Sequence, residues 1–329
     1  MKLVTFEVPT PLGPFQRLGA LRGDQIVDLQ AAFAAYLKSE NEPQPLRLAE
    51  TDIPPDMRQF LANGRCGWFN AERGLAFVET VLKSGEMVQG PRGETLLYDR
   101  TAVRLKAPLA PASLRDFLAF EAHTKTGFAR LGEPFPEAWY KMPVYYKGNP
   151  RSIVGPEEDV RWPSFTQMLD YELELACVIG REGRDISVEA APAYIAGYTV
   201  MNDWSARDIQ RTEMSVRLGP AKGKDFATSL GPCLVTPDEL DPRNLRMVAR
   251  INGEVWSEGN AGSSHWTFPQ MIHHVSMDET IYPGDVLGSG TVGGGCGLEL
   301  DRWLKPGDVV ELEIQGIGVL RNRVVRREG

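Results

Sequence analysis

The segment from Leu169 to Gly180, LDYELELACVIG, has the composition of a buried β-strand but carries two acidic residues, Glu172 and Glu174. In an extended chain, residues two positions apart point to the same face, so both carboxyl groups leave one side of the strand. A solvated face is the common explanation for such a pair. However, the acidic face continues into Ala176, which favours a buried position. Two facing carboxyl groups in a dry place either share a proton or hold a cation.

The composition is that of an ordinary globular protein. The length of 329 residues favours two domains, and the contents of 42% hydrophobic and 24% charged residues are typical. The net charge of -8 opposes binding to a phosphate backbone or an anionic membrane, so we expect no nucleic-acid or membrane partner. The start, MKLVTFEVPTPLG, lacks the pattern of a signal peptide, and we expect a cytoplasmic protein.

The cysteines and histidines give little support for a soft-metal site. The four cysteines lie far apart without a CxxC pair, which argues against a zinc knuckle or a disulfide framework. A histidine-based cluster would need nearly all of the four histidines. Carboxylates are therefore the better candidates for metal ligands.

The pattern of secondary-structure signals in the sequence changes near residue 108. Before it, a strand signal at 2–8 and helical patterns such as 29–40 indicate a small α+β unit, and a proline-punctuated stretch follows. After it, strand signals broken by glycine and proline predominate. We predict an accessory domain at 1–108 and a mostly β domain at 109–329, an α+β chain whose second part is a mixed sheet folded on itself.

Residues 113–125, SLRDFLAFEAHTK, are predicted to form a helix. Asp116 and His123 are seven positions apart and would project the same way, two turns from each other. A histidine among phenylalanines is commonly a packed residue, and the aspartate on the same face makes it a candidate base as well.

A second polar segment is MNDWSARDIQRTE, residues 201–213. Asn202 and Asp203 suit a helix start, which would align Asp203, Arg207 and Gln210 on one face. The alternative is a surface ion pair, which contributes only about 0.3–0.5 kcal/mol.

Two glycine-rich segments resemble nucleotide sites only superficially. LGPAKGKDFATSLGP carries Lys224 but lacks the spacing and the hydroxyl residue of a phosphate loop. GSGTVG, residues 288–293, satisfies GxGxxG without room for the phosphate-binding helix that should follow. We predict a tight glycine loop that presents Thr291 and Glu299 to a ligand. The similar acidic pair at Glu311 and Glu313 is interpreted as a wet face.

Taken in order, these segments resemble the fumarylacetoacetate hydrolase family over everything after about residue 110. The resemblance is carried by DFLAFEAH, DYELELA, MNDWSARDIQ, GKDFATSLGP and GSGTVGGGCGLEL. It implies a mixed β-sandwich roll as the catalytic domain, assembled as a homodimer, while the first part resembles the small accessory domain of larger members. Leu118 replaces a tyrosine of the hydrolases proper, so the chain looks more like the bacterial branch.

The resemblance also implies a metal site. Its ligands would be four carboxylates around one divalent cation, which explains the paired glutamates of the opening strand. Oxygen donors favour Mg²⁺ or Ca²⁺, with Mn²⁺ also acceptable, over zinc or copper. The implied ligands are Asp116, Glu172, Glu174 and Asp203.

The implied catalytic groups surround this site. His123 would be the general base, oriented by Glu299, and would activate water. The enolate leaving group would be held by the metal with Arg207, Gln210 and Lys224. Two further residues, Tyr146 and Thr291, would contact the substrate.

The resemblance therefore predicts a hydrolase that cleaves a carbon–carbon bond in a 1,3-diketo acid such as fumarylacetoacetate, fumarylpyruvate or another acylpyruvate. The alternative within the family is a decarboxylase, tautomerase or hydratase/isomerase that acts on a 2-oxo acid through a metal-held enolate. Outside catalysis, the cation could merely fasten the sheet to the helices. An NAD-dependent oxidoreductase lacks its required helix.

Overall fold

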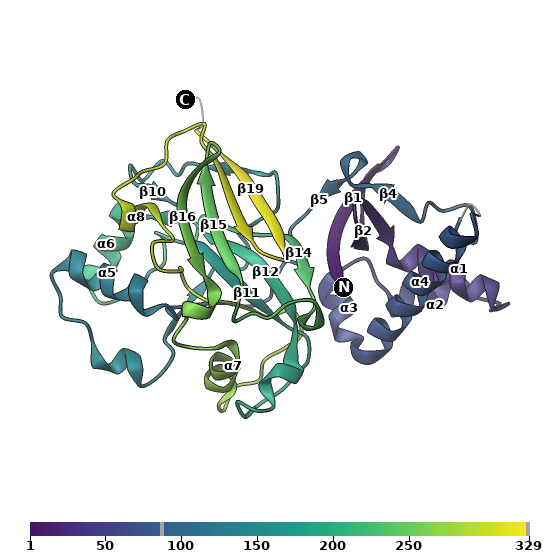
Figure 1. Cartoon of the computed structure of the whole chain (residues 1–329), viewed down its shortest axis with the longest axis horizontal. Coiled ribbons are helices and arrows are strands. Elements are labelled where there is room, and N and C mark those ends of the chain that lie inside the picture. The colour runs from purple at the N-terminus through teal and green to yellow at the C-terminus, as the bar shows by residue number, and fades with distance from the viewer. Residues whose placement is uncertain (86–88, 327–329) are drawn as a thin grey trace. The chain divides into compact units, whose positions relative to one another are not determined.

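A computed structural model describes residues 1–85 and 89–326, and the chain divides into two compact units, Met1–Leu109 and Ala110–Gly329 (Figure 1). Both units combine helices and strands, so the predicted α+β class is confirmed.

The first unit is an antiparallel sheet with helices. Its strand order is β4-β3-β2-β1, and β5 also pairs with β1. Asp28 caps the start of helix α1, because its carboxylate accepts the Ala31 N–H. The helix packs small side chains against α4 and the sheet. The strands are β1 (Lys2–Thr10), β2 (Gly13–Arg22), β3 (Gln25–Asp28), β4 (Leu97–Asp99) and β5 (Arg104–Leu105), and the helices are α1 (Leu29–Ser39), α2 (Pro45–Asp52), α3 (Met57–Ala62) and α4 (Gly64–Ser84).

The second unit is built on two layered mixed sheets. One has the order β14-β12-β11-β17-β6-β7, with β8 beside β14, and the other has the order β16-β15-β18-β19-β9. Strands β12 and β14 contact β18 and β19, so the layers enclose a shared core, as predicted for a β-sandwich roll. The first sheet uses β6 (Leu114–Phe117), β7 (Tyr145–Gly148), β8 (Ile153–Val154), β11 (Leu173–Ile179), β12 (Ile195–Asp203), β14 (Thr228–Val235) and β17 (Val286–Gly288), and the second uses β9 (Asp159–Arg161), β15 (Arg246–Ile251), β16 (Glu254–Asn260), β18 (Val309–Ile314) and β19 (Gly318–Val325).

The helices of this unit lie around the sheets. Figure 1 shows α5, α6 and α8 gathered on one side and α7 apart from them. A short ladder of β10 (Leu169–Asp170) with β13 (Ser205–Ala206) precedes α6. The helices are α5 (Glu121–Leu131), α6 (Arg207–Ser215), α7 (Phe268–Ser276) and α8 (Gly297–Leu300).

The acidic strand of the opening segment lies at the centre of the larger sheet. β11 pairs antiparallel with β12 on one edge and with β17 on the other, and all of its residues are buried. A strand covered on both faces reads as a continuous apolar run, which explains its composition. Glu172 is 4% exposed and Glu174 is 0% exposed, so a solvated face is the wrong explanation for the pair.

The helix predicted for residues 113–125 is wrong in its first half. Residues 114–117 form β6, which runs parallel to β17 and antiparallel to β7, and α5 begins only at Glu121. All four β6 residues are buried, so pairing within the sheet overrides the local helical pattern. Asp116 therefore lies on a strand and His123 in the first turn of a helix.

The helix start predicted at Asn202 and Asp203 is also wrong. Both residues end β12, where Asn202 pairs with Leu173 and Ser229, and α6 begins at Arg207. Asp203 thus approaches the other acidic residues along a strand rather than along a helix face.

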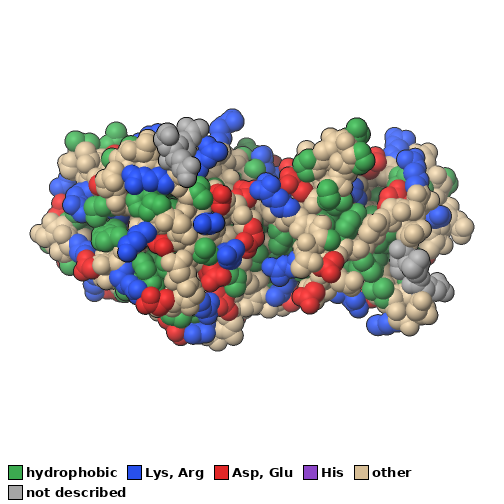
Figure 2. Space-filling view, turned by 90° about the horizontal axis from the view of Figure 1, so that it is seen from above, with side chains coloured by type: hydrophobic (Ala, Val, Ile, Leu, Met, Phe, Trp, Pro, Cys, Tyr) green, Lys and Arg blue, Asp and Glu red, His purple; other side chains and the backbone are tan. Residues whose placement is uncertain are grey.

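The surface carries mixed charge. On the face shown in Figure 2, acidic and basic side chains are interspersed. Glu311 and Glu313 are 28% and 38% exposed, in agreement with the predicted wet face. In the part of the chain that the structure describes, every helix is too short or too polar to cross a membrane.

Candidate active site

Neighbouring strands bring four carboxyl groups to one buried point. Asp116 comes from β6, Glu174 from β11, Asp203 from the end of β12, and Glu172 from the residue just before β11. One oxygen from each lies within 4.8 Å of the others, and all four residues are buried. β17 lies between β6 and β11 in the sheet order, and its last residue, Gly288, pairs with Asp116.

Glycine is required at position 288 for this convergence. A Cβ atom there would overlap the Asp116 carboxylate and would lie 2.7 Å from the Met201 side chain and 3.1 Å from Glu174 Oε2. The adjoining loop adds donors: the Gly290 N–H donates to Asp116 Oδ1 (3.2 Å) and the Thr291 hydroxyl donates to Glu174 Oε1 (3.2 Å).

Two buried cations and a phenol border the acidic cluster. Lys224 donates to Glu172 and, at 2.5 Å, to Asp203 Oδ2. Arg207 Nη2 lies 2.9 Å from Glu172 Oε1. The Tyr146 hydroxyl donates to Asp203 Oδ2 at 2.7 Å. These contacts satisfy one side of the cluster.

The acidic cluster contains more carboxyl groups than there are positive charges beside it. Burial and the Asp203 charge raise the pKa of Asp116 well above its usual range, and burial and the Asp116 charge do the same to the pKa of Glu174. Burial also raises the pKa of Asp203. Burial alone would raise the pKa of Glu172 too, but Lys224 and Arg207 bring it well below its usual range. Without a further positive charge, the cluster must take up protons.

The residues fit a divalent cation. Among residues 1–85 and 89–326, Glu174 Oε2 and Asp203 Oδ1 are buried oxygens to which no hydrogen bond is donated. Buried polar atoms normally have partners, so these two oxygens are available as ligands. A donor set composed of carboxylate oxygens suits Mg²⁺, Ca²⁺ or Mn²⁺. The buried acidic cluster is thus consistent with a divalent metal site.

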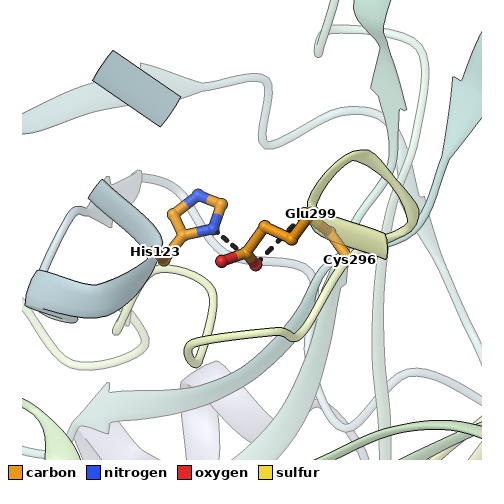
Figure 3. Close-up of side chains that lie close together, drawn as sticks. All are labelled: His123, Cys296 and Glu299. Carbon is orange, nitrogen blue, oxygen red and sulfur yellow. Dashed lines mark hydrogen bonds and ion pairs between the residues drawn. The ribbon is translucent and has the colours of Figure 1, made fainter. Parts of the chain in front are cut away.

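A histidine–carboxylate pair lies beside the cluster. His123 Nδ1 and Glu299 Oε2 are 2.9 Å apart, and the Cys296 thiol donates to the same oxygen at 3.4 Å (Figure 3). The second ring nitrogen of His123 points away from Glu299 (Figure 3). The backbone holds this pair near the acids, because Glu172 forms a bridge with Cys296 and the Leu173 N–H donates to Gly295 O (3.0 Å).

This pair has the arrangement of a base and its orienting group. Burial would raise the pKa of Glu299, but hydrogen bonds with His123 and with the Gly294 N–H bring it below the usual value. An ionised Glu299 accepts a hydrogen bond from the N–H at Nδ1 of His123. In a neutral imidazole this tautomer leaves the lone pair on Nε2. A lone pair held in this way can accept a proton from a bound molecule.

All of the predicted site residues lie in this region. Gln210, on α6, contacts it indirectly, since its side-chain oxygen accepts a hydrogen bond from Arg207 Nη1 at 3.0 Å. Thr291 and Tyr146, predicted to contact substrate, bond to acidic residues of the cluster. Their role towards a substrate stays a prediction.

Sequence reasoning missed two participants. Asp170 is fully buried and bonds to Arg207. It is the first residue of the DYELELA motif and could have been considered with the two glutamates. Cys296 was not considered as a site residue, and no spacing rule would have placed it against Glu299.

Comparisons with known proteins identify a family and several relatives of the chain. The family model described as "Fumarylacetoacetate (FAA) hydrolase C-terminal" matches residues 113–325. Human oxaloacetate tautomerase FAHD2A, mitochondrial, is 33% identical over 99% of this chain and 92% of that protein. Oxaloacetate tautomerase YisK of Bacillus subtilis (strain 168) is 31% identical over 76% of this chain and 83% of that protein. The solved fumarylacetoacetate hydrolase from psychrophilic Exiguobacterium antarcticum matches with a TM-score of 0.70 and 25% identity, covering 99% of this chain and all of the other.

Proposed function

Because the chain belongs to the fumarylacetoacetate hydrolase family, as its motifs predicted, we propose that it is a divalent-cation-dependent tautomerase of a 2-oxo dicarboxylic acid such as oxaloacetate. The observation that carries the proposal is the meeting of four buried carboxylates with the His123–Glu299 pair. Similarity to named oxaloacetate tautomerases from two distant organisms supports this choice over the hydrolase that the motifs first suggested.

The cation would be held by Asp116, Glu172, Glu174 and Asp203. When bound, it would attract the oxygens of a 2-oxo acid and stabilise negative charge that develops on them. Lys224 and Arg207 would remain beside Glu172 and contribute positive charge at the edge of the site.

The reaction itself requires only proton movement. In the enol-to-keto direction, the enol oxygen loses a proton, the C=C double bond becomes a C=O double bond, and the carbon next to the one that bears the oxygen gains a proton. Atoms and electrons therefore balance without water or an oxidant. Nε2 of His123 is the base that takes the proton and returns it to carbon. Glu299 keeps the ring oriented and stabilises its charge while the proton is held.

The second candidate is the predicted hydrolase. The same His123–Glu299 pair could deprotonate a water molecule instead of the substrate, and the similarity to a solved fumarylacetoacetate hydrolase favours it. The two reactions differ in their products, because hydrolysis breaks a carbon–carbon bond and tautomerisation keeps the skeleton intact.

The test follows the enol absorption of freshly dissolved oxaloacetate with the protein and Mg²⁺ or Mn²⁺, and identifies the products by NMR. We expect faster loss of the enol with an unchanged skeleton, and loss of this activity with a chelator. Metal without protein sets the background rate. His123→Ala should return the rate to that background, whereas His273→Ala, on α7, should not. Cleaved products from oxaloacetate or from a panel of acylpyruvates would instead support the hydrolase.

A further inference from the structure

Asp170 is a buried carboxylate that connects the two parts of the site. It ends β10 and is 0% exposed. Its side chain bonds to Arg207 and to the start of α8, the helix that carries Glu299, and it lies outside the four-carboxylate cluster.

One set of contacts fixes the backbone that carries Glu299. Asp170 Oδ1 accepts the Gly297 N–H at 2.8 Å, and Oδ2 accepts the Leu298 N–H at 3.0 Å. A Cβ atom on Gly297 would lie 2.6 Å from Oδ1, so glycine permits this close approach. Because Glu299 is the next residue, the direction of its side chain towards His123 depends on this anchor.

The other set of contacts fixes Arg207. Its Nε donates to Asp170 Oδ2 at 2.8 Å, and its Nη2 lies 2.7 Å from the same oxygen. Because a guanidinium group is planar with donors at fixed angles, this anchor sets where the other donors point. Nη1 donates to Gln210 Oε1 at 3.0 Å, and Nη2 lies 2.9 Å from Glu172 Oε1 as an ion pair.

We propose that Asp170 is a positioning residue that holds Arg207 and the His123–Glu299 pair in register, and this role rests on the proposed function. A carboxylate offers acceptors only, and here every contact comes from an N–H group. An amide in its place turns an NH₂ group towards one of these donors, so Asp170→Asn breaks one of the connections. Loss of an outer partner of this kind typically lowers activity about 10- to 100-fold.

Asp28 provides a matched control. It is also buried, pairs with an arginine (Arg17 Nε to Oδ2, 2.5 Å) and accepts a backbone N–H from Ala31 at 2.9 Å, but it belongs to the other unit. We expect Asp170→Asn to lower kcat about 10- to 100-fold. Asp28→Asn should lower thermal stability and leave kcat within about threefold. Equal kcat for wild type and Asp170→Asn would overturn the proposal.

A double-mutant cycle separates positioning from general damage. If Asp170 acts partly through Glu299, Asp170→Asn must cost less activity in a Glu299→Gln background than in the wild type. Losses of equal size in both backgrounds would overturn the proposal. KM and kcat are measured separately for each variant, since a change confined to KM would also contradict an effect through the proton-transfer pair.

Hydrogen exchange gives a readout that does not depend on activity. The Gly297 and Leu298 amides should exchange faster in Asp170→Asn, and the Ala31 amide should do so only in Asp28→Asn. Should Asp170→Asn not fold, Asp170→Glu keeps the charge and is measured in the same way. Unchanged exchange at Gly297 and Leu298 overturns the proposal.

A wild-type protein inactive on 2-oxo acids refutes the proposed function, whereas an active wild type with an equally active Asp170→Asn refutes only the positioning role.

Discussion

Replacing Glu299 by glutamine tests the base-and-orienter arrangement most directly. The substitution keeps the size of the side chain and removes its charge. The side chains of His123 and Glu299 are 12% and 6% exposed, so water screens their interaction only weakly. The effect of the missing charge should therefore be large when His123 carries a proton and small when it is neutral.

The magnitude follows from the 2.9 Å between His123 Nδ1 and Glu299 Oε2. Two unit charges at this separation attract by about 6 kcal/mol at an effective dielectric constant of about 20, which is an upper bound. The hydrogen bond that glutamine retains, together with desolvation, reduces the loss to about 3–4 kcal/mol. We therefore expect kcat to fall about 100- to 1000-fold, since each 1.36 kcal/mol is about tenfold.

The assay is the tautomerase rate of Glu299→Gln beside Glu311→Gln, a control on a half-exposed strand face. Only the first variant should lose turnover, and both should bind Mn²⁺. Because the folded protein lowers the pKa of Glu299, this group adds stability above its usual pKa and loses that contribution as the pH falls through the lowered value. The stability gap between wild type and Glu299→Gln should accordingly close on acidification. A variant with kcat within threefold of wild type would refute the reasoning.

Three further outcomes are expected. The folded protein raises the pKa values of Asp116, Glu174 and Asp203, so their protonation stabilises the metal-free protein at acid pH, and this stabilisation is lost as the pH rises through those values. The increase in Tm on adding Mg²⁺ to chelator-treated protein should therefore grow with pH. An increase that stays constant with pH would contradict this prediction. Lys224→Met should destabilise the metal-free protein by about 3–5 kcal/mol, measured by urea unfolding, because two buried carboxylates lose their partner, while Lys222→Met should change it by no more than about 0.5 kcal/mol. Gly288→Ala should abolish Mn²⁺ binding by filling the space between Asp116 and Glu174, whereas Gly127→Ala, on α5 with open space at the added Cβ, should bind Mn²⁺ normally and gain up to about 1 kcal/mol; retained binding in Gly288→Ala would disprove the packing argument.

The sequence predicted the strands of the second unit well, because most of them show an apolar run together with a glycine or proline near its end. The apolar run 173–179 ends at Gly180, so both its interior and its carboxyl end are visible in the sequence. The first unit was predicted less completely. Strands β3, β4 and β5 and helix α2 were missed, because elements of two to eight residues give little periodicity to detect. The ten-residue strand β2 was missed because Gly13, Pro14 and Gly19 interrupt its pattern.

Local sequence patterns predict only part of the candidate site. The paired glutamates are visible because both lie on one strand face. The positions of Asp116 and Asp203 depend instead on β6 pairing with β17 and on β12 pairing with β11, contacts between segments far apart in the chain. Helical spacing therefore placed both residues on the wrong element, although the family motifs identified them correctly as members of one cluster.

A cation bound at the acidic cluster would act on both stability and catalysis, and the substitution His123→Ala separates these two roles. Buried like charges oppose folding, so a cation that neutralises them stabilises the sheet whether or not the protein is an enzyme. A purely structural cation would need neither the imidazole of His123 nor its bond to Glu299. His123→Ala should therefore keep the rise in Tm on adding Mg²⁺, because the four carboxylates are untouched, and should lose turnover. If that variant keeps full tautomerase activity, the base is not His123. If it loses the rise in Tm as well, the acidic cluster and the histidine are not separable parts.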